Sequence, residues 1–275
     1  FDGGLSLNPA DFKPANDDFK ALLQTEEAKT NVLEIDLKAA GIWDEDDANS
    51  YSDDADRHIF YVNYEMQTVA KWPNEGYYTS ELVDIENCVT GSNGEELGLV
   101  YIPQDRYDLW KTSEHLRFFG YPYHDWSSST VEDIALSPEQ PALLYPVNLG
   151  YGLRSGCYFF IYNIAAELDR PGEYYWDVKN GKLYYWPTDG FETSKISFSQ
   201  FKGKCINSNG ASHVTIDGLT FENIRNIAVN GIGTNDFTVM NSTFRCLTNY
   251  AVLLNGNNNR ISGNTMYNLA SGGVY

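Results

Sequence analysis

The clearest pattern of hydrophobic and polar positions lies near the end of the chain, where three stretches repeat. They read HVTIDGLTFENI (213–224), DFTVMNSTFRCL (236–247) and NRISGNTMYNL (259–269), with steps of 23 and then 22 residues. One column of the repeat holds Ile216, Val239 and Ile261, and another holds Phe221, Phe244 and Met266. Short β-branched runs at so short a period, separated by Asn and Gly, predict stacked β-strands rather than helix pairs.

A further column holds Val229, Val252 and Val274, and Ile206 extends it back by one period. The apolar columns are expected to point inward and to build one continuous core. Turn positions are expected to carry left-handed backbone, which Asn tolerates; they are occupied by Asn223, Asn241, Asn264 and Asn268. The predicted fold class is all-β, with residues 191–275 forming a right-handed parallel β-helix of about 22–23 residues per rung. A second chain, an oligomer or further rungs are expected to cover its open end after Tyr275.

Residues 1–190 have different patterning, which predicts a β-rich, β-sandwich-like domain that precedes the repeats or is inserted into them. One short helix is expected within 16–30, with Asn16 as its N-cap and an acidic first turn. Strands are predicted over 31–37 and 156–164, and a hairpin pair over 58–72.

The stretch ELDRPGEYYWDVKNGKLYYWP (167–187) predicts a second hairpin, because Asn180-Gly181 is typical of a two-residue turn. That turn would place Val178 opposite Leu183 and Trp176 opposite Tyr185. One face is uncharged and is predicted to be buried; it holds Tyr174, Trp176, Val178, Leu183 and Tyr185. The other face mixes charge with aromatic rings and is the predicted outer face, where a sugar cleft could lie; it includes Glu173, Tyr175, Asp177, Tyr184 and Trp186.

Charge narrows the choice of partner. The net charge is −19, and the acidic excess belongs to residues 1–190. Such a surface repels nucleic acid and anionic membranes, so a neutral or weakly charged partner fits better.

No run reaches the length of about 18 apolar residues that a spanning helix needs. The four cysteines lack zinc-site spacing, so no metal is expected at sulfur and free thiols are predicted.

An acidic run, DEDDANSYSDDAD (44–56), is the one candidate segment for binding a cation. Its spacing differs from that of an EF-hand loop. A solvated loop is the favoured interpretation, and weak Ca²⁺ binding is the alternative; no other cofactor is expected.

Two aromatic segments offer candidate sugar contacts. KWPNEGYY (71–78) supplies Trp72, Asn74 and Glu75, and FFGYPYHDW (118–126) supplies His124 and Trp126. Aromatic rings beside a loop stack on sugar rings or pack the edge of a sheet, and both roles remain open. Glu173 and Trp186 of the second hairpin complete the predicted set of substrate contacts.

These segments, in this order and followed by rungs such as HVTIDGLTF, resemble a group of right-handed β-helix carbohydrate-active enzymes. They are glycoside hydrolases in which a β-rich domain interrupts the helix, of β-xylosidase-like and fucosidase- or xylanase-like families. The resemblance implies a carbohydrate substrate and a secreted or periplasmic bacterial location. It transfers no catalytic residue, because in such enzymes the catalytic carboxylates are expected on later rungs, here beyond Tyr275.

Within the repeats, acidic residues occur only at Asp217, Glu222 and Asp236. Their columns neighbour inward ones, so all three are predicted to face solvent. Asp217 is the weak catalytic candidate, because its side chain would project from a strand face. Two alternatives to the hydrolase remain, a polysaccharide lyase and a non-catalytic sugar-binding or adhesive β-helix. The lyase needs positive charge at the site, whereas Arg225, Arg245 and Arg260 fall in different columns.

Overall fold

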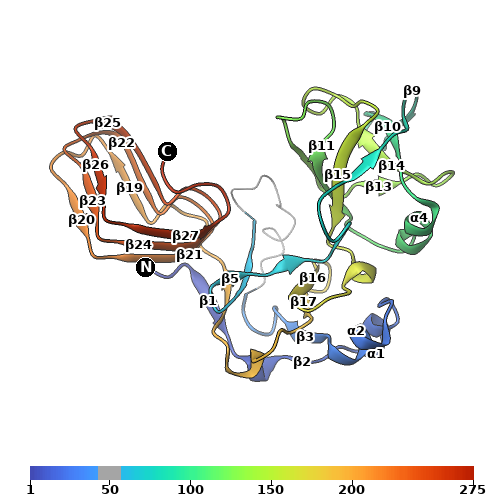
Figure 1. Ribbon diagram of the computed structural model, residues 1–275, viewed down its shortest axis with the longest axis horizontal. Coiled ribbons are helices and arrows are strands. Elements are labelled where there is room, and N and C mark those ends of the chain that lie inside the picture. The colour runs from blue at the N-terminus through green and yellow to red at the C-terminus, as the bar shows by residue number, and fades with distance from the viewer. Residues whose placement is uncertain (43–56) are drawn as a thin grey trace. The chain divides into compact units, whose positions relative to one another are not determined.

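Figure 1 shows the computed structural model, which describes residues 1–42 and 57–275. The chain forms two compact units, each assembled from separate stretches of sequence. Unit 1 contains Phe1–Lys13, Asp36–Gln67 and Thr188–Tyr275, and unit 2 contains Pro14–Ile35 and Thr68–Pro187. Strands dominate the regular structure of the described part and helices are few, as the all-β prediction requires.

The repeated stretches of unit 1 form three separate parallel sheets of three strands each (Figure 1). The chain visits the three sheets in turn, three times over. The strands are β19 (Ile206–Asn209), β20 (Thr215–Asp217), β21 (Thr220–Ile224), β22 (Val229–Asn235), β23 (Thr238–Met240), β24 (Thr243–Leu247), β25 (Val252–Asn257), β26 (Arg260–Ser262) and β27 (Thr265–Leu269). Each strand pairs in parallel with the strand one repeat later, which confirms the predicted stacking.

The predicted columns are confirmed residue by residue. The paired sets are Ile216–Val239–Ile261, Phe221–Phe244–Met266 and Ile206–Val229–Val252–Val274. Phe221 and Phe244 are fully buried, and their rings stack with centroids 5.0 Å apart. Because each repeat covers the apolar side chains of its neighbour, the stacked rings form a continuous core.

Three of the four asparagines predicted at turns have left-handed backbone. Asn223, Asn241 and Asn268 have φ of 59°, 49° and 52°. Asn264 differs: its Oδ1 accepts a hydrogen bond from the Ser242 backbone N–H at 2.9 Å. Its amide therefore links neighbouring repeats instead of allowing an unusual turn.

Unit 1 also contains an antiparallel sheet of β1 (Gly4–Leu7), β18 (Ile196–Ser199), β4 (Phe60–Val62) and β5 (Glu65–Met66), in that order. Of the stretch 58–72, only β4 and β5 form the predicted hairpin, and its turn residues Asn63 and Tyr64 have φ of 51° and 67°. The remainder, residues 68–72, pairs with other strands in unit 2. The N-terminus adds an unpredicted feature. Phe1 stacks on Phe221 at 5.1 Å, and Asp2 pairs in parallel with Glu222, so the first residues extend the phenylalanine column backwards.

Unit 2 contains three sheets. The first has the strand order β2 (Lys13–Pro14), β3 (Leu33–Asp36), β17 (Lys182–Tyr185), β16 (Glu173–Asp177) and β6 (Thr68–Val69). The second has the order β12 (Ser129–Val131), β11 (Arg117–Tyr121), β15 (Cys157–Tyr162) and β7 (Lys71–Trp72), and β8 (Tyr78–Ser80) also pairs with β15. The third has the order β13 (Ala135–Leu136), β14 (Ala142–Pro146), β10 (Glu96–Tyr101) and β9 (Val83–Thr90). A core of large side chains packs within this unit, with Trp110, Phe118, Tyr145 and Phe159 fully buried.

The helices are short: α1 (Asp17–Lys20), α2 (Glu26–Asn31) and α4 (Gln104–Trp110), with single turns η1 (Pro9–Asp11), η2 (Ala165–Glu167) and η3 (Phe191–Thr193). Asn16 caps α1 as predicted, since its Oδ1 accepts from the Phe19 N–H at 2.9 Å. The single helix expected within 16–30 is divided into two, because the Thr25 hydroxyl accepts from the Ala28 N–H at 3.1 Å and starts α2.

Candidate functional site

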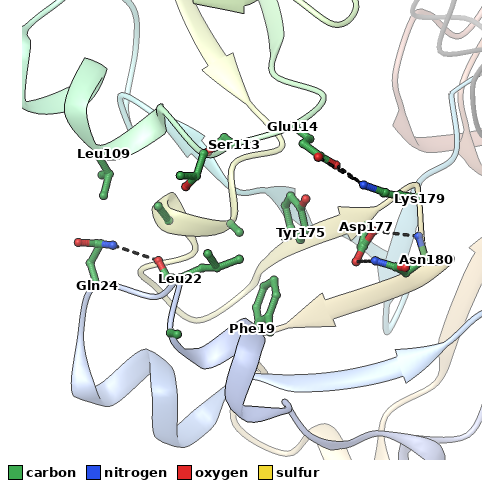
Figure 2. A pocket seen from close by; sticks show the side chains of 14 residues that line it. Phe19, Leu22, Gln24, Leu109, Ser113, Glu114, Tyr175, Asp177, Lys179 and Asn180 are labelled. Carbon is green, nitrogen blue, oxygen red and sulfur yellow. Dashed lines mark hydrogen bonds and ion pairs between the residues drawn. The ribbon is translucent and has the colours of Figure 1, made fainter.

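Unit 2 contains a hollow of about 530 Å³, shown in Figure 2 and called here the Phe19–Tyr175 hollow. Four segments line it: the end of α1 with the following turn, the residues after α4, the turn η2, and the hairpin of β16 and β17. The lining residues are Phe19, Ala21, Leu22, Gln24, Leu109, Thr112, Ser113, Glu114, Ala165, Ala166, Tyr175, Asp177, Lys179 and Asn180. Its volume lies within the range of about 300–1,000 Å³ that is usual for small-molecule sites.

Aromatic rings form one wall of the hollow. Phe19 stacks flat on Tyr184 with centroids 3.4 Å apart and lies 5.6 Å from Tyr175. The N-cap Asn16 holds this wall, because its Nδ2 also donates to the Tyr184 hydroxyl at 3.2 Å. Burial raises the pKa of Tyr175, and the nearby Asp177 carboxylate adds to the rise. Its hydroxyl therefore stays protonated and able to donate a hydrogen bond.

Polar groups form the rim. Lys179 Nζ lies 3.1 Å from Glu114 Oε2, and both side chains are well exposed. The Asp177 carboxylate accepts two hydrogen bonds from Asn180, one from the backbone N–H at 3.0 Å and one from the side-chain Nδ2 at 2.8 Å. Gln24 donates to the Leu22 carbonyl. The rim thus presents two carboxylates, one ammonium group and two amides beside the aromatic wall (Figure 2).

The predicted register of this hairpin is wrong by two residues. The observed pairs are Trp176 with Leu183 and Asp177 with Lys182, because Asp177 caps a longer loop and its carbonyl accepts from the Gly181 N–H at 2.9 Å. A shift by an even number leaves every side chain on its face. The predicted buried face is accordingly confirmed, with all five residues buried.

The predicted outer face is wrong for three residues, since Glu173, Tyr184 and Trp186 are buried. Trp186 is only 4% exposed, and its backbone N–H donates to the backbone carbonyl of Glu173. The cause is the remainder of unit 2, which covers this face of the strands. Tyr175, Asp177 and Lys179 keep the outer position and line the hollow.

Several of the predicted substrate contacts come together around Glu173. The Asp169 N–H donates to Glu173 Oε2 at 3.1 Å, and Asn74 Nδ2 donates to Asp169 Oδ1 at 2.9 Å. Glu75 pairs with Arg170 at 2.8 Å. Arg170 lies 3.8 Å from Glu173, too far to offset burial. Burial raises the pKa of Glu173 to about 7.

The other predicted contacts divide between packing and surface. Trp72 packs against Trp110 with centroids 5.5 Å apart, which is a core contact. His124 and Trp126 lie on a loop elsewhere in unit 2 and stack on each other at 5.1 Å. Their roles as substrate contacts remain predictions.

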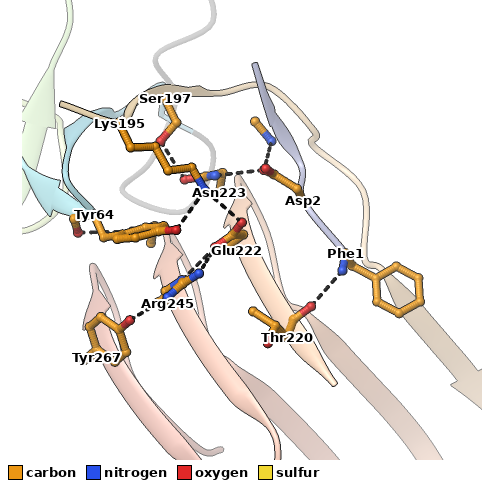
Figure 3. A network of polar contacts seen from close by, with 12 residues as sticks. Phe1, Asp2, Tyr64, Lys195, Ser197, Thr220, Glu222, Asn223, Arg245 and Tyr267 are labelled. Atoms are coloured by element: carbon orange, nitrogen blue, oxygen red, sulfur yellow. Dashed lines mark hydrogen bonds and ion pairs between the residues drawn. The ribbon is translucent and has the colours of Figure 1, made fainter. Parts of the chain in front are cut away.

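In unit 1, Asp217 is exposed as predicted, and it accepts a hydrogen bond from Asn241 Nδ2 at 2.9 Å. Asp236 is also exposed. The exposed position predicted for Glu222 is wrong, because Glu222 is 9% exposed beneath the β4–β5 hairpin. Figure 3 shows why: the cations of Lys195, just before β18, and of Arg245 in β24 lie against its carboxylate.

The network around Glu222 joins neighbouring elements of unit 1. Arg245 Nε donates to Glu222 Oε2 at 2.6 Å, and Lys195 Nζ lies 3.3 Å from Oε1. The ring of Tyr64 lies 3.7 Å from the Arg245 guanidinium carbon, and its hydroxyl accepts from Lys195 at 2.9 Å. Arg245 also donates to the Tyr267 hydroxyl. The network therefore fastens the β4–β5 turn to the sheet of β21, β24 and β27, a structural role.

The Glu222→Gln variant is expected to lose about 2–3 kcal/mol of unfolding free energy, because Arg245 and Lys195 would lose their counter-charge in a partly buried site. Urea unfolding followed by circular dichroism measures the loss. Asp236→Asn is the control, since Asp236 forms an exposed pair with His213 and should cost less than about 1 kcal/mol. Equal small losses in both variants would contradict the structural role.

Sequence reasoning missed Phe19, Gln24 and Glu114 as parts of one hollow. The available signal was the Asn16 cap, which fixes the position of Phe19 at the third residue of α1. The acidic run 44–56, the alternative site for weak Ca²⁺ binding, lies outside the described residues. Within residues 1–42 and 57–275, no group of three His, Cys, Asp or Glu side chains could hold a metal ion. The four cysteines are free, and no described helix is long and apolar enough to cross a membrane.

Comparisons with known proteins give one informative result. No protein-family profile and no curated protein matches the chain. A solved structure titled "Glycoside hydrolase" matches with a TM-score of 0.54 and 12% sequence identity. The match covers 93% of this chain and 51% of that hydrolase, so the chain spans about half the length of its structural neighbour. At this identity the likeness concerns the fold.

Proposed function

We propose that the chain is part of a glycoside hydrolase and that the Phe19–Tyr175 hollow binds a saccharide. The observation that carries the proposal is the aromatic wall beside a rim of carboxylates, amides and an ammonium group in a hollow of about 530 Å³. A sugar ring has an apolar C–H face and a polar edge of hydroxyls. The wall suits the face, and the rim supplies donors and acceptors for the hydroxyls.

Charge favours a neutral sugar over a uronate. The rim carries Glu114 and Asp177 against Lys179 alone, and the chain as a whole has a net charge of −19. An acidic sugar would meet repulsion at close range. This is also the reason to prefer hydrolysis to lyase chemistry, which acts on uronates.

We propose that the stacked repeats are rungs of a right-handed parallel β-helix, with a β-sandwich-like insertion, in a protein exported from the bacterial cytoplasm. Hydrolysis needs two carboxyl groups across the scissile bond. We place this pair on rungs beyond Tyr275, in line with the 51% coverage of the structural neighbour, and Asp217 stays a candidate.

A panel of neutral and acidic oligosaccharides tests the function. Calorimetric titration should show binding of a neutral sugar, and a reducing-end assay on the complete protein should show hydrolysis. Unsaturated products would instead indicate a lyase, and binding without any turnover would indicate a sugar-binding protein.

The Ala21→Trp variant tests the hollow, because Ala21 is an exposed lining residue and an indole there would occupy the space of the sugar. We expect a loss of at least about tenfold in saccharide affinity, equivalent to about 1.4 kcal/mol. Ala40→Trp, at an exposed site outside the hollow, should leave the affinity unchanged. Full affinity in Ala21→Trp would place the ligand elsewhere.

A further inference from the structure

A second aromatic group of unit 2 lies on its surface, outside the Phe19–Tyr175 hollow. Trp126 is 71% exposed and Tyr151 is 58% exposed. Single exposed aromatic side chains are ordinary, but a cluster of them on the surface marks a binding site. Tyr123 and His124 belong to the same cluster, through ring contacts of 4.7 Å between them and 5.1 Å from His124 to Trp126.

The exposed rings are held in place by their neighbours. The imidazole of His124 stacks on Trp126 with an angle of 13° between the planes, and Tyr151 meets both rings edge-on at 5.0 and 5.2 Å. Arg154 anchors the loop, since its Nη2 lies 2.5 Å from Asp125 Oδ1 and its backbone N–H donates to the Pro122 carbonyl. Rings fixed before binding lose little conformational entropy when a ligand arrives.

The cluster continues into the outer face of the sheet. The Tyr158 hydroxyl donates to the Asp125 carbonyl at 3.3 Å, and Tyr158 stacks on Tyr121 at 4.8 Å. Tyr77, 42% exposed, meets both rings edge-on. The aromatic surface thus continues from the loop of Tyr123, His124 and Trp126 to rings of β11 and β15, so it offers more than one ring on which sugar units could stack.

We propose that this surface, the Trp126 platform, binds a neutral polysaccharide chain. The Asp125 carboxylate is balanced by Arg154, so the platform presents little net charge and offers an ionic ligand no counter-ion. Its indole and phenol groups combine flat apolar faces with hydrogen-bonding edges, which complements the C–H faces and hydroxyls of linked sugar units. The choice of a sugar as the occupant rests on the proposed function, which the platform extends from a short saccharide to a polymer.

Affinity electrophoresis through gels containing soluble neutral polysaccharides tests the platform. A polymer that retards the parent protein should be bound at least about tenfold more weakly by Trp126→Ala and by Tyr151→Ala. Titration of a short saccharide into the hollow should be unchanged in both variants. Ile85→Ala, which removes a 52% exposed apolar side chain elsewhere in unit 2, is the matched control and should be retarded like the parent.

Unchanged retardation of Trp126→Ala would overturn the platform, as would a parent protein that no neutral polymer retards. Sedimentation gives a further outcome: a dimer that dissociates in Trp126→Ala would identify a second copy as the occupant and also overturn the proposal. The two proposals fail separately. Polymer retention that depends on Trp126, without hydrolysis or saccharide binding in the hollow, would overturn only the proposed function.

Discussion

Replacing Phe244 by alanine is expected to lower the free energy of unfolding by about 3–5 kcal/mol. Phe244 is fully buried in the middle of its column, where it stacks on Phe221 and pairs in register with Met266. Removing the ring leaves a cavity that the neighbouring repeats cannot fill, since the backbone ladders fix the spacing between them. Thermal and urea unfolding, followed by far-ultraviolet circular dichroism, measure the loss.

The control for this variant is Ile232→Ala. Ile232 lies in the same unit on β22, but it is 44% exposed, so its truncation should cost less than about 1 kcal/mol. A loss in Phe244→Ala no larger than that in Ile232→Ala would contradict a core built from in-register columns.

The Glu173→Gln variant is expected to remove a pH-dependent component of stability of about 3 kcal/mol. Burial raises the pKa of Glu173 from 4.5 to about 7, whereas the unfolded chain keeps the ordinary value. The folded protein therefore binds the extra proton, and this stabilisation is fully present below pH 4.5. It is lost as the pH rises through about 7, where the buried carboxyl must ionise.

The measurement is the urea midpoint of both proteins at several values between pH 4.5 and 8. The parent should lose stability relative to Glu173→Gln over this interval, and the difference should level off above pH 7. Glu27→Gln, which changes an exposed glutamate of α2, should follow the pH profile of the parent. A constant difference between the parent and Glu173→Gln would show that the carboxyl has no raised pKa in the folded state.

Local sequence rules explain why some elements were predictable. Asn16 forms the N-cap because its side chain acts on an N–H three residues away. The columns of the repeats were predictable because strands that stack in register repeat their apolar positions at the same interval. The hairpin of β16 and β17 shows the limit of such rules: Asn180-Gly181 marked a turn, but the Asp177 side chain lengthened the loop and moved the register.

Burial of charged groups depended on distant segments. Glu222 looked exposed from its column, and it is covered because three distant segments meet at its carboxylate: Lys195 just before β18, Arg245 of β24, and Tyr64 of the β4–β5 turn. The Phe19–Tyr175 hollow likewise required segments separated by more than a hundred residues to meet.

The sequence by itself determined the β-rich class, the period of the repeats, the inward columns and the uncharged face of the second hairpin. These properties follow from the alternation and spacing of side chains along neighbouring strands, which are local. Only the tertiary structure decided that residues 1–13 and 36–67 belong to the same unit as 188–275. It also placed Phe1 on the phenylalanine column and brought Glu114 to the rim beside Tyr175. Such contacts join residues far apart in the chain. The sequence pattern of a single segment does not indicate which distant segment will pack against it.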